Sequence, residues 1–163
     1  GFGEVAAGIG IVYLCRGFGS GFGPMVARPL MAMPRVMPYL IGFALAGSGL
    51  LYIGVSTFEW GMLTLVCIFF SHGCSGVSWV FSTTLLQRRS EDEWMGRVAG
   101  TDNLVITLTM GVSTIFAGLA MEHEVVTLRE MLLITAGIQI SVGMLWLLLA
   151  SPGERSYMAT TEA

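Results

Sequence analysis

Lysine is absent from this chain of 163 residues, and charge of either sign is scarce. Only 12% of the residues are charged, about half of the share that is usual in soluble domains, and all eight basic residues are arginines. The formal net charge of −3 gives no sign of nucleic-acid binding. A phosphate-binding loop of the Gly-Lys type is excluded, because it needs a lysine.

Cysteine and histidine are too few and too scattered for a disulfide framework or a zinc site. Cys15, Cys67 and Cys74 all lie within apolar runs, where a thiol usually acts as a small hydrophobic group. A metal site made of Cys67, His72 and Cys74 is disfavoured, because side chains at that spacing on one helix do not all share a face. We therefore expect no metal and no cofactor.

Apolar sequence is what the chain has in abundance. Hydrophobic residues make up 54% of it, and its mean hydropathy is +0.75. A soluble domain of this size exposes too much surface to hide so many apolar side chains. Runs long enough to cross a bilayer, which takes about 20 residues, cover 5–27, 37–57, 61–86, 98–120 and 131–150. The sequence therefore predicts an all-α, polytopic transmembrane helix bundle with five spanning helices.

The arginines predict how the spans are oriented. One side collects most of them: Arg28, Arg35, Arg88, Arg89, Arg97 and Arg155. The other side has only Arg129, so the positive-inside rule places the first side in the cytoplasm. We expect the protein to lie in the plasma membrane. The beginning of the chain then lies outside, and residues 151–163 form a disordered cytoplasmic tail. The chain begins with Gly1 and shows no signal-peptide pattern, so we expect it to be the C-terminal part of a longer protein.

The connector before the fourth span carries a helix-start signal. Ser90 and Glu93 have the spacing of a capping box, and Asp92 adds negative charge where a helix N-terminus favours it. We expect these residues to begin the fourth helix. Asp102 follows about one turn inside that helix, where it can pair with an arginine at the membrane rim.

The stretch RGFGSGFGPMVAR, residues 16–28, is unusually rich in glycine. It does not fit a dinucleotide fingerprint, because the sixth position counted from Gly17 is Phe22. In a bilayer, glycine is tolerated and lets helices approach closely. The sequence predicts a packing face, static or rocking, formed by Gly10, Gly17, Gly19, Gly21, Gly23 and Pro24.

Three side chains within the spans are candidates for a polar cavity. Arg16 lies near the middle of the first span, where a charge costs roughly 2.5–3.5 kcal/mol and must face water or a carboxylate. It can contact substrate or take part in proton coupling, form a structural ion pair, or reach the membrane interface if the helix is tilted. His72 is near the centre of the third span and can relay protons or bond between helices. Trp79 can supply an aromatic wall or simply pack.

The spacing of Gly10, Gly19 and Gly23-Pro24 resembles the glycine–proline motif of antiporters in the major facilitator superfamily. That family usually has this motif on its fifth helix. The orientation of the present span matches the eighth helix instead, which packs against the fifth across the two halves of such a transporter. The resemblance implies that this surface serves the joint about which the halves rock.

The segment STTLLQRRSEDEWMGRV is similar to the connector between the tenth and eleventh helices of drug and siderophore exporters of the enterobactin-exporter type. The matching positions are Thr84, Leu85, Leu86, Gln87, Asp92, Glu93, Gly96 and Arg97. The segment ARPLMAMPR resembles the basic loop after the eighth helix through Arg28 and Arg35. On this alignment the five spans correspond to helices eight to twelve.

The resemblance implies a secondary transporter that moves a small solute by alternating access and is not an enzyme. The implied substrate is an amphipathic drug-like compound or a siderophore, exported in exchange for protons. The implied partners are the lipid bilayer and the N-terminal half of the same transporter. A cytoplasmic gate is implied at Asp92, Glu93, Gly96, Arg97 and Asp102. The alternatives are an integral-membrane enzyme, for which no acid–base cluster is evident, and a membrane scaffold, which has little use for Arg16.

Overall fold

The structure is a computed structural model and describes residues 2–33 and 35–154. Its five long helices are α1 (Phe2–Ala27), α2 (Met37–Thr57), α3 (Met62–Arg89), α4 (Met95–Glu122) and α5 (Leu128–Leu145). The 3-10 turn η1 (Arg28–Ala32) continues α1, and the π-helical turn η2 (Trp146–Ala150) continues α5. All five helices are long and apolar enough to cross a membrane, which confirms the predicted all-α fold with five spans.

The helix boundaries agree closely with the predicted spans. The second span matches α2 at both ends, and the ends of α1, α3 and α4 and the start of α5 lie within three residues of the predicted ones. Residues 151–154, which we expected in the disordered tail, continue the last helix instead. Ser151 is fully buried and donates a hydrogen bond to the Leu147 carbonyl, and Glu154 forms an ion pair with Arg89. Residues 155–163 of the predicted tail, with Arg155, lie outside the described residues.

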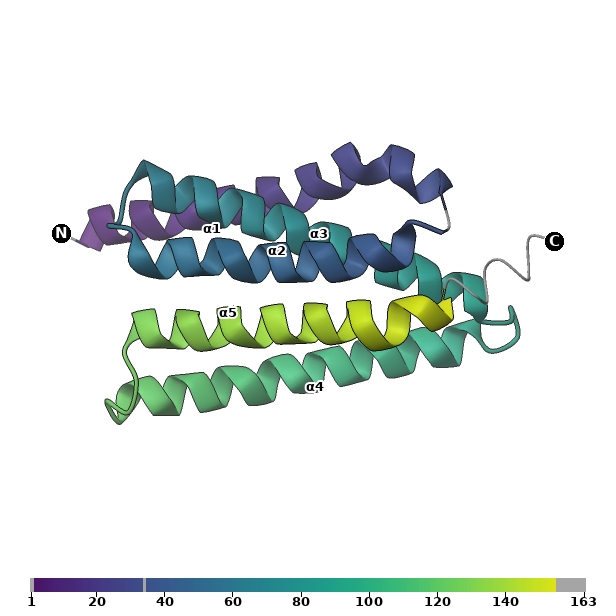
Figure 1. The fold of residues 1–163 in the computed structure, drawn as a ribbon. Coiled ribbons are helices and arrows are strands. Elements are labelled where there is room, and N and C mark those ends of the chain that lie inside the picture. The colour runs from purple at the N-terminus through teal and green to yellow at the C-terminus, as the bar shows by residue number, and fades with distance from the viewer. Residues whose placement is uncertain (1, 34, 155–163) are drawn as a thin grey trace.

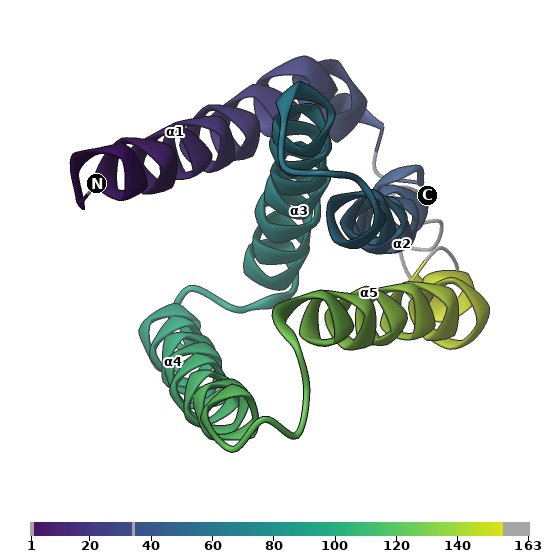
Figure 2. The same ribbon diagram turned by 90° about the vertical axis from the view of Figure 1, so that its left-hand side faces the viewer.

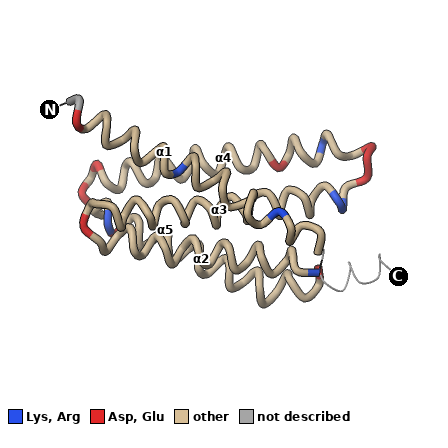
Figure 3. Tube along the Cα trace, turned by 90° about the horizontal axis from the view of Figure 1, so that it is seen from above, with Lys and Arg blue, Asp and Glu red and all other residues tan. Residues whose placement is uncertain are grey.

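The helices run back and forth between two ends of the bundle (Figure 1). The beginning of α1 and the connectors α2–α3 and α4–α5 lie at one end, which we call the N-terminal end. The connectors α1–α2 and α3–α4 lie at the other end. Charged residues gather mainly at these two ends (Figure 3). The second end, called the arginine-rich end, carries Arg28, Arg35, Arg88, Arg89 and Arg97.

Helix α3 lies at the centre of the packed part of the bundle. It packs against α1 on one side and α2 on another, and α2 also packs against α5 (Figure 2). Helix α4 stands apart: it packs closely against none of the other described helices and none of its residues is buried. The packed body is therefore formed by α1, α2, α3 and α5, and α4 is held mainly by its connectors.

The hydrophobic core lies toward the arginine-rich end, where α1, α2 and α3 converge. Its buried residues are Ala27, Met37, Ile41, Phe81 and Leu85. Trp146 packs against this cluster, and its indole Nε1 donates a hydrogen bond of 2.7 Å to the Pro38 carbonyl. That bond satisfies the polar edge of a large side chain in an apolar setting and fixes η2 to the start of α2.

Small residues set the distance between α1 and α3. A Cβ at Gly19 would overlap the Phe69 carbonyl, and a Cβ at Gly23 would overlap the Gly73 carbonyl. The backbones therefore touch directly, as small residues at a helix crossing allow in membranes. A Cβ at Gly76 would likewise overlap the Ser20 carbonyl.

A second close crossing joins α2 and α5. A Cβ at Gly49 would lie 2.7 Å from the Ala136 carbonyl oxygen, and one at Gly143 would lie 2.8 Å from the Gly42 carbonyl oxygen. Between α2 and α3, the buried hydroxyls of Ser48 and Ser71 are hydrogen-bonded at 2.9 Å. Within a lipid bilayer the hydrophobic effect does not bring helices together, so close backbone packing and interhelical hydrogen bonds hold them in contact.

The predicted capping box at the start of the fourth span is wrong. Ser90 is the residue that ends α3, and its hydroxyl donates to the Leu86 carbonyl at 2.9 Å. Trp94 precedes α4 and makes no side-chain cap hydrogen bond. Helix α3 continues about one turn past its predicted end at residue 86, so Ser90 bonds back to α3 and does not begin α4. A capping box does occur at α5, where Thr127 and Glu130 bond reciprocally.

Candidate functional site

A cavity of about 240 Å³ contains two of the three predicted cavity residues. Arg16 enters it from α1 and His72 from α3. Fourteen residues of α1 precede Arg16 and eleven follow it, so the guanidinium is attached near the middle of the helix. The remaining lining residues are Val12, Tyr13, Tyr52, Val55, Trp60, Ile68, Leu128 and Leu132.

Tyr52 of α2 completes the polar part of the cavity. Its hydroxyl and the Nε2 atom of His72 are hydrogen-bonded at 3.2 Å, and the two rings meet edge to face with centroids 6.1 Å apart. Sequence reasoning missed Tyr52, because a tyrosine near the end of an apolar helix is common at membrane interfaces. Twenty residues separate it from His72, so no local pattern connects them.

Arg16 has no carboxylate partner at ion-pair distance among the described residues. Its guanidinium carbon lies 5.9 Å from the centre of the Tyr13 ring, and the side chain is exposed. The Arg16 carbonyl accepts a hydrogen bond from Ser20 within the same helix. The charge is therefore available to water or to a ligand entering the cavity.

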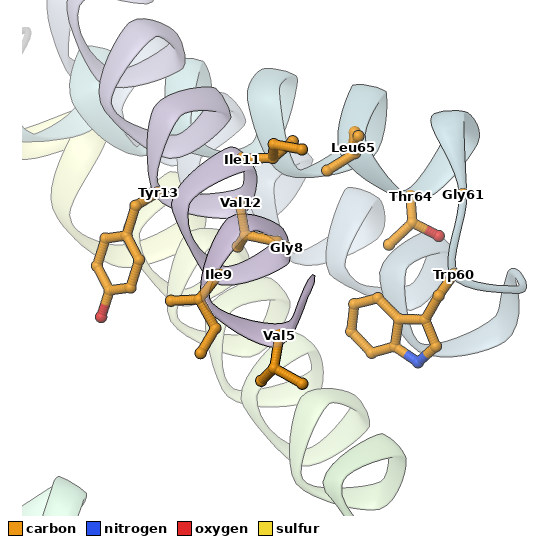
Figure 4. A pocket seen from close by; sticks show the side chains of 10 residues that line it. All are labelled: Val5, Gly8, Ile9, Ile11, Val12, Tyr13, Trp60, Gly61, Thr64 and Leu65. Atoms are coloured by element: carbon orange, nitrogen blue, oxygen red, sulfur yellow. The ribbon is translucent and has the colours of Figure 1, made fainter. Parts of the chain in front are cut away.

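The cavity lies toward the N-terminal end of the bundle. Trp60 belongs to the α2–α3 connector at that end, and Leu128 is the first residue of α5. A neighbouring groove of about 520 Å³ follows α1 beside the start of α3 (Figure 4). Tyr13 and Trp60 line both spaces, and Val5 and Trp60 stand on the two sides of the groove. Apolar side chains thus lead from this end of the bundle to the polar cavity.

Trp79, the third predicted cavity residue, does not line this cavity. It lies about two turns beyond His72 on α3, and 52% of its surface is exposed. The structure gives it neither a packed position nor a place beside Arg16.

The predicted glycine face divides into two parts. Gly19, Gly23 and Pro24 lie against α3, as the crossing described above requires. The other three glycines, Gly10, Gly17 and Gly21, have no atom within 4 Å of an added Cβ and line an apolar groove on the outside of α1.

The predicted gate residues lie at the arginine-rich end, and only two of them share a cavity. Arg97 and Asp102 line a space of about 470 Å³ between the end of α3 and the start of α4. The Arg97 guanidinium lies 4.7 Å from the centre of the Trp94 ring. No ion pair joins Arg97 to Asp92, Glu93 or Asp102 in the described part of the chain, and Gly96 is exposed.

An ion pair that sequence reasoning missed does lie at this end. Arg89 at the end of α3 and Glu154 after η2 approach to 2.9 Å. Sixty-five positions separate them, so only the fold brings them together. The pair ties the last turn of the described chain to α3, which α5 itself does not contact closely.

No group of three or more His, Cys, Asp or Glu side chains in residues 2–33 and 35–154 is placed to hold a metal ion. Comparison of the chain with protein-family models, with curated proteins and with solved structures gives no match. The five candidate spans indicate a multi-pass integral membrane protein in contact with the lipid bilayer.

Proposed function

We propose that this chain is the C-terminal part of a secondary transporter, which moves a small solute by alternating access across the plasma membrane. The observation that carries the proposal is the exposed guanidinium of Arg16 near the middle of an apolar spanning helix, beside a cavity and without a carboxylate partner in the described chain. Substrate sites of secondary transporters lie near the bilayer midplane.

The charge of Arg16 is costly at this depth in the membrane. A guanidinium at the centre of a bilayer costs roughly 2.5–3.5 kcal/mol on insertion scales, and such residues face a bundle interior or a water-filled cavity. The face of α1 that carries Arg16 is therefore turned toward an aqueous path. A protein that only holds other proteins together has no need of such a residue, which supports transport over a scaffold.

The packing supports a larger bundle than five helices. Helix α4 lacks close neighbours within the described chain, and the outer groove of α1 is lined by Gly10, Gly17 and Gly21. Small residues on a membrane helix favour contact with another helix. We propose that helices of an N-terminal half cover these faces, in keeping with the resemblance to the major facilitator superfamily.

The coupling ion in this proposal is the proton. Histidine changes its charge near neutral pH, and His72 lines the same cavity as Arg16 while hydrogen-bonded to Tyr52. Protonation of His72 alters both its charge and its bond to Tyr52. Arg97 and Asp102 line the cavity at the arginine-rich end, which we place in the cytoplasm, and they serve there as gate residues.

A transport assay tests this proposal. The complete protein is reconstituted into liposomes, an inward or outward pH gradient is imposed, and the flux of a panel of amphipathic compounds is measured. We expect gradient-dependent flux of at least one compound, and loss of that flux in Arg16→Ala. Absence of gradient-dependent flux for the whole panel rejects the transporter, and unchanged flux in Arg16→Ala removes Arg16 from the site.

A further inference from the structure

We propose that the cavity around Arg16 binds a small organic acid through its carboxylate, with a short hydrocarbon part against the apolar walls. This inference deepens the proposed function and rests on it for the transport of the bound acid. Binding itself can be measured without any transport.

The charge of the cavity lining favours an anion. Among the ten residues that line the cavity, Arg16 carries a fixed positive charge, His72 can gain one, and none is acidic. The guanidinium presents donors in a planar fork that matches a carboxylate with two parallel hydrogen bonds. A cationic compound would be repelled here, and a neutral one would leave the guanidinium without a charged partner.

The hydrogen bond between Tyr52 and His72 leaves a donor for the same ligand. When the Tyr52 hydroxyl donates to Nε2, the imidazole keeps an N–H at Nδ1. When Nε2 donates instead, the Tyr52 hydroxyl hydrogen is free. Either arrangement leaves one further N–H or O–H on a side chain that lines the same cavity as Arg16.

The size and walls of the cavity limit the rest of the ligand. Its volume of about 240 Å³ is below the range of roughly 300–1,000 Å³ that drug-sized ligands occupy. The walls are aliphatic and aromatic: Val12, Tyr13, Val55, Trp60, Ile68, Leu128 and Leu132. A small amphipathic acid fits this combination, with its charged end at Arg16 and its hydrocarbon toward Trp60 and Leu128.

The experiment measures binding in nanodiscs made only of zwitterionic phosphatidylcholine, so that no anionic lipid competes. The probes are radiolabelled 3-phenylpropionate and 3-phenylpropionamide, which share a skeleton and differ in charge. Equilibrium dialysis against empty nanodiscs corrects for partition into lipid. The variants are Arg16→Gln, Tyr52→Phe and, as a control for loss of one arginine, Arg28→Gln, which lies at the opposite end of the bundle and does not line the cavity.

We expect saturable binding of the carboxylate, at least about tenfold tighter than binding of the amide, because hydrogen bonds to charged groups are the stronger ones. Arg16→Gln should reduce carboxylate affinity to that of the amide, Tyr52→Phe should reduce it severalfold, and Arg28→Gln should leave it unchanged. Equal affinity for the two probes, or unchanged binding in Arg16→Gln, overturns the inference.

A thermal melt of the same samples separates ligand binding from a structural role. An exposed arginine without a carboxylate partner costs insertion energy, so Arg16→Gln should melt no lower than the unchanged protein. A lower melting temperature together with no carboxylate binding assigns Arg16 to a structural ion pair and overturns the inference. Carboxylate binding without gradient-driven flux keeps this site and rejects the transporter, whereas flux without preference for the carboxylate does the reverse.

Discussion

At the scale of single residues, the crossing of α1 and α3 depends on positions where even a methyl group has no room. Pro24 lacks an amide hydrogen, so the Ser20 carbonyl one turn earlier loses its partner within the helix. That carbonyl faces Gly76, where an added Cβ would also meet the Pro24 ring. The missing hydrogen bond and the missing side chain therefore coincide at one contact between the two helices.

Gly23→Ala should destabilise the protein by about 1–3 kcal/mol, the usual cost of overpacking, because the new methyl group would overlap the Gly73 backbone. Backbone cannot move aside as a flexible side chain can. The measurement is the free energy of unfolding in mixed detergent micelles, from a titration with sodium dodecyl sulfate.

Gly137→Ala on α5 provides the matched control, since Gly137 lies outside the faces that we propose to be covered by further helices. No atom lies within 4 Å of a Cβ at Gly137, so the substitution should be neutral or slightly stabilising. Equal unfolding free energies for Gly137→Ala and Gly23→Ala would contradict the close crossing of α1 and α3.

The sequence singled out some of the residues that line the cavity and gave no signal for others. Arg16 and His72 stand out because polar groups are rare within membrane spans, and the structure places both at one cavity. Tyr52 gives no such signal, since its ring is as acceptable to lipid as to a cavity. The exposed position of Trp79 shows the same limit, because a tryptophan suits lipid, protein and cavity alike.

At the scale of elements, the start of α5 has the best-formed cap in the structure. The Thr127 side chain accepts from the Glu130 amide, while the Glu130 carboxylate accepts from the Thr127 amide at 2.7 Å. Two amide groups that the helix itself leaves unpaired are thereby satisfied. Such a cap fixes the residue at which a helix begins at the membrane boundary.

Thr127→Ala should weaken the first turn of α5 by about 1 kcal/mol, the typical effect of removing a cap side chain. Hydrogen exchange of the Glu130 and Met131 amides, which bond to Thr127, should become roughly fivefold faster, because about 1 kcal/mol corresponds to that factor in local opening. Ser90→Ala is the control, since its hydroxyl bonds to Leu86 in α3 and does not cap α4. Unchanged exchange at the start of α5 would count against the cap.

The existence and extent of the helices could be predicted from the sequence, but which helices pack against each other could not. Bilayer thickness imposes a length of about 20 apolar residues, which any hydropathy pattern displays. Glycines occur on every span, so nothing distinguished the seam of Gly42, Gly49 and Gly143 from the open positions of Gly10 and Gly17. The capping-box pattern recurred at two connectors, and only the fold decides that Thr127, not Ser90, begins a helix.

At the scale of the whole molecule, the proposed transport depends on the bundle crossing the membrane with its arginine-rich end in the cytoplasm. The alternation of the five helices places the connectors α1–α2 and α3–α4 at that end and the connectors α2–α3 and α4–α5 at the opposite end (Figure 1). With that orientation the Arg16 cavity lies toward the outer leaflet, and the space lined by Arg97 and Asp102 lies at the inner one.

Labelling of single cysteines from the two sides of the membrane tests this arrangement most directly. In a background with Cys15, Cys67 and Cys74 replaced by alanine, one cysteine is introduced at Glu93 or at Val125, which lie in connectors at opposite ends. A membrane-impermeant maleimide should label position 125 in intact cells, and position 93 only after permeabilisation. Labelling of position 93 in intact cells, or of both positions from the same side, would contradict the account.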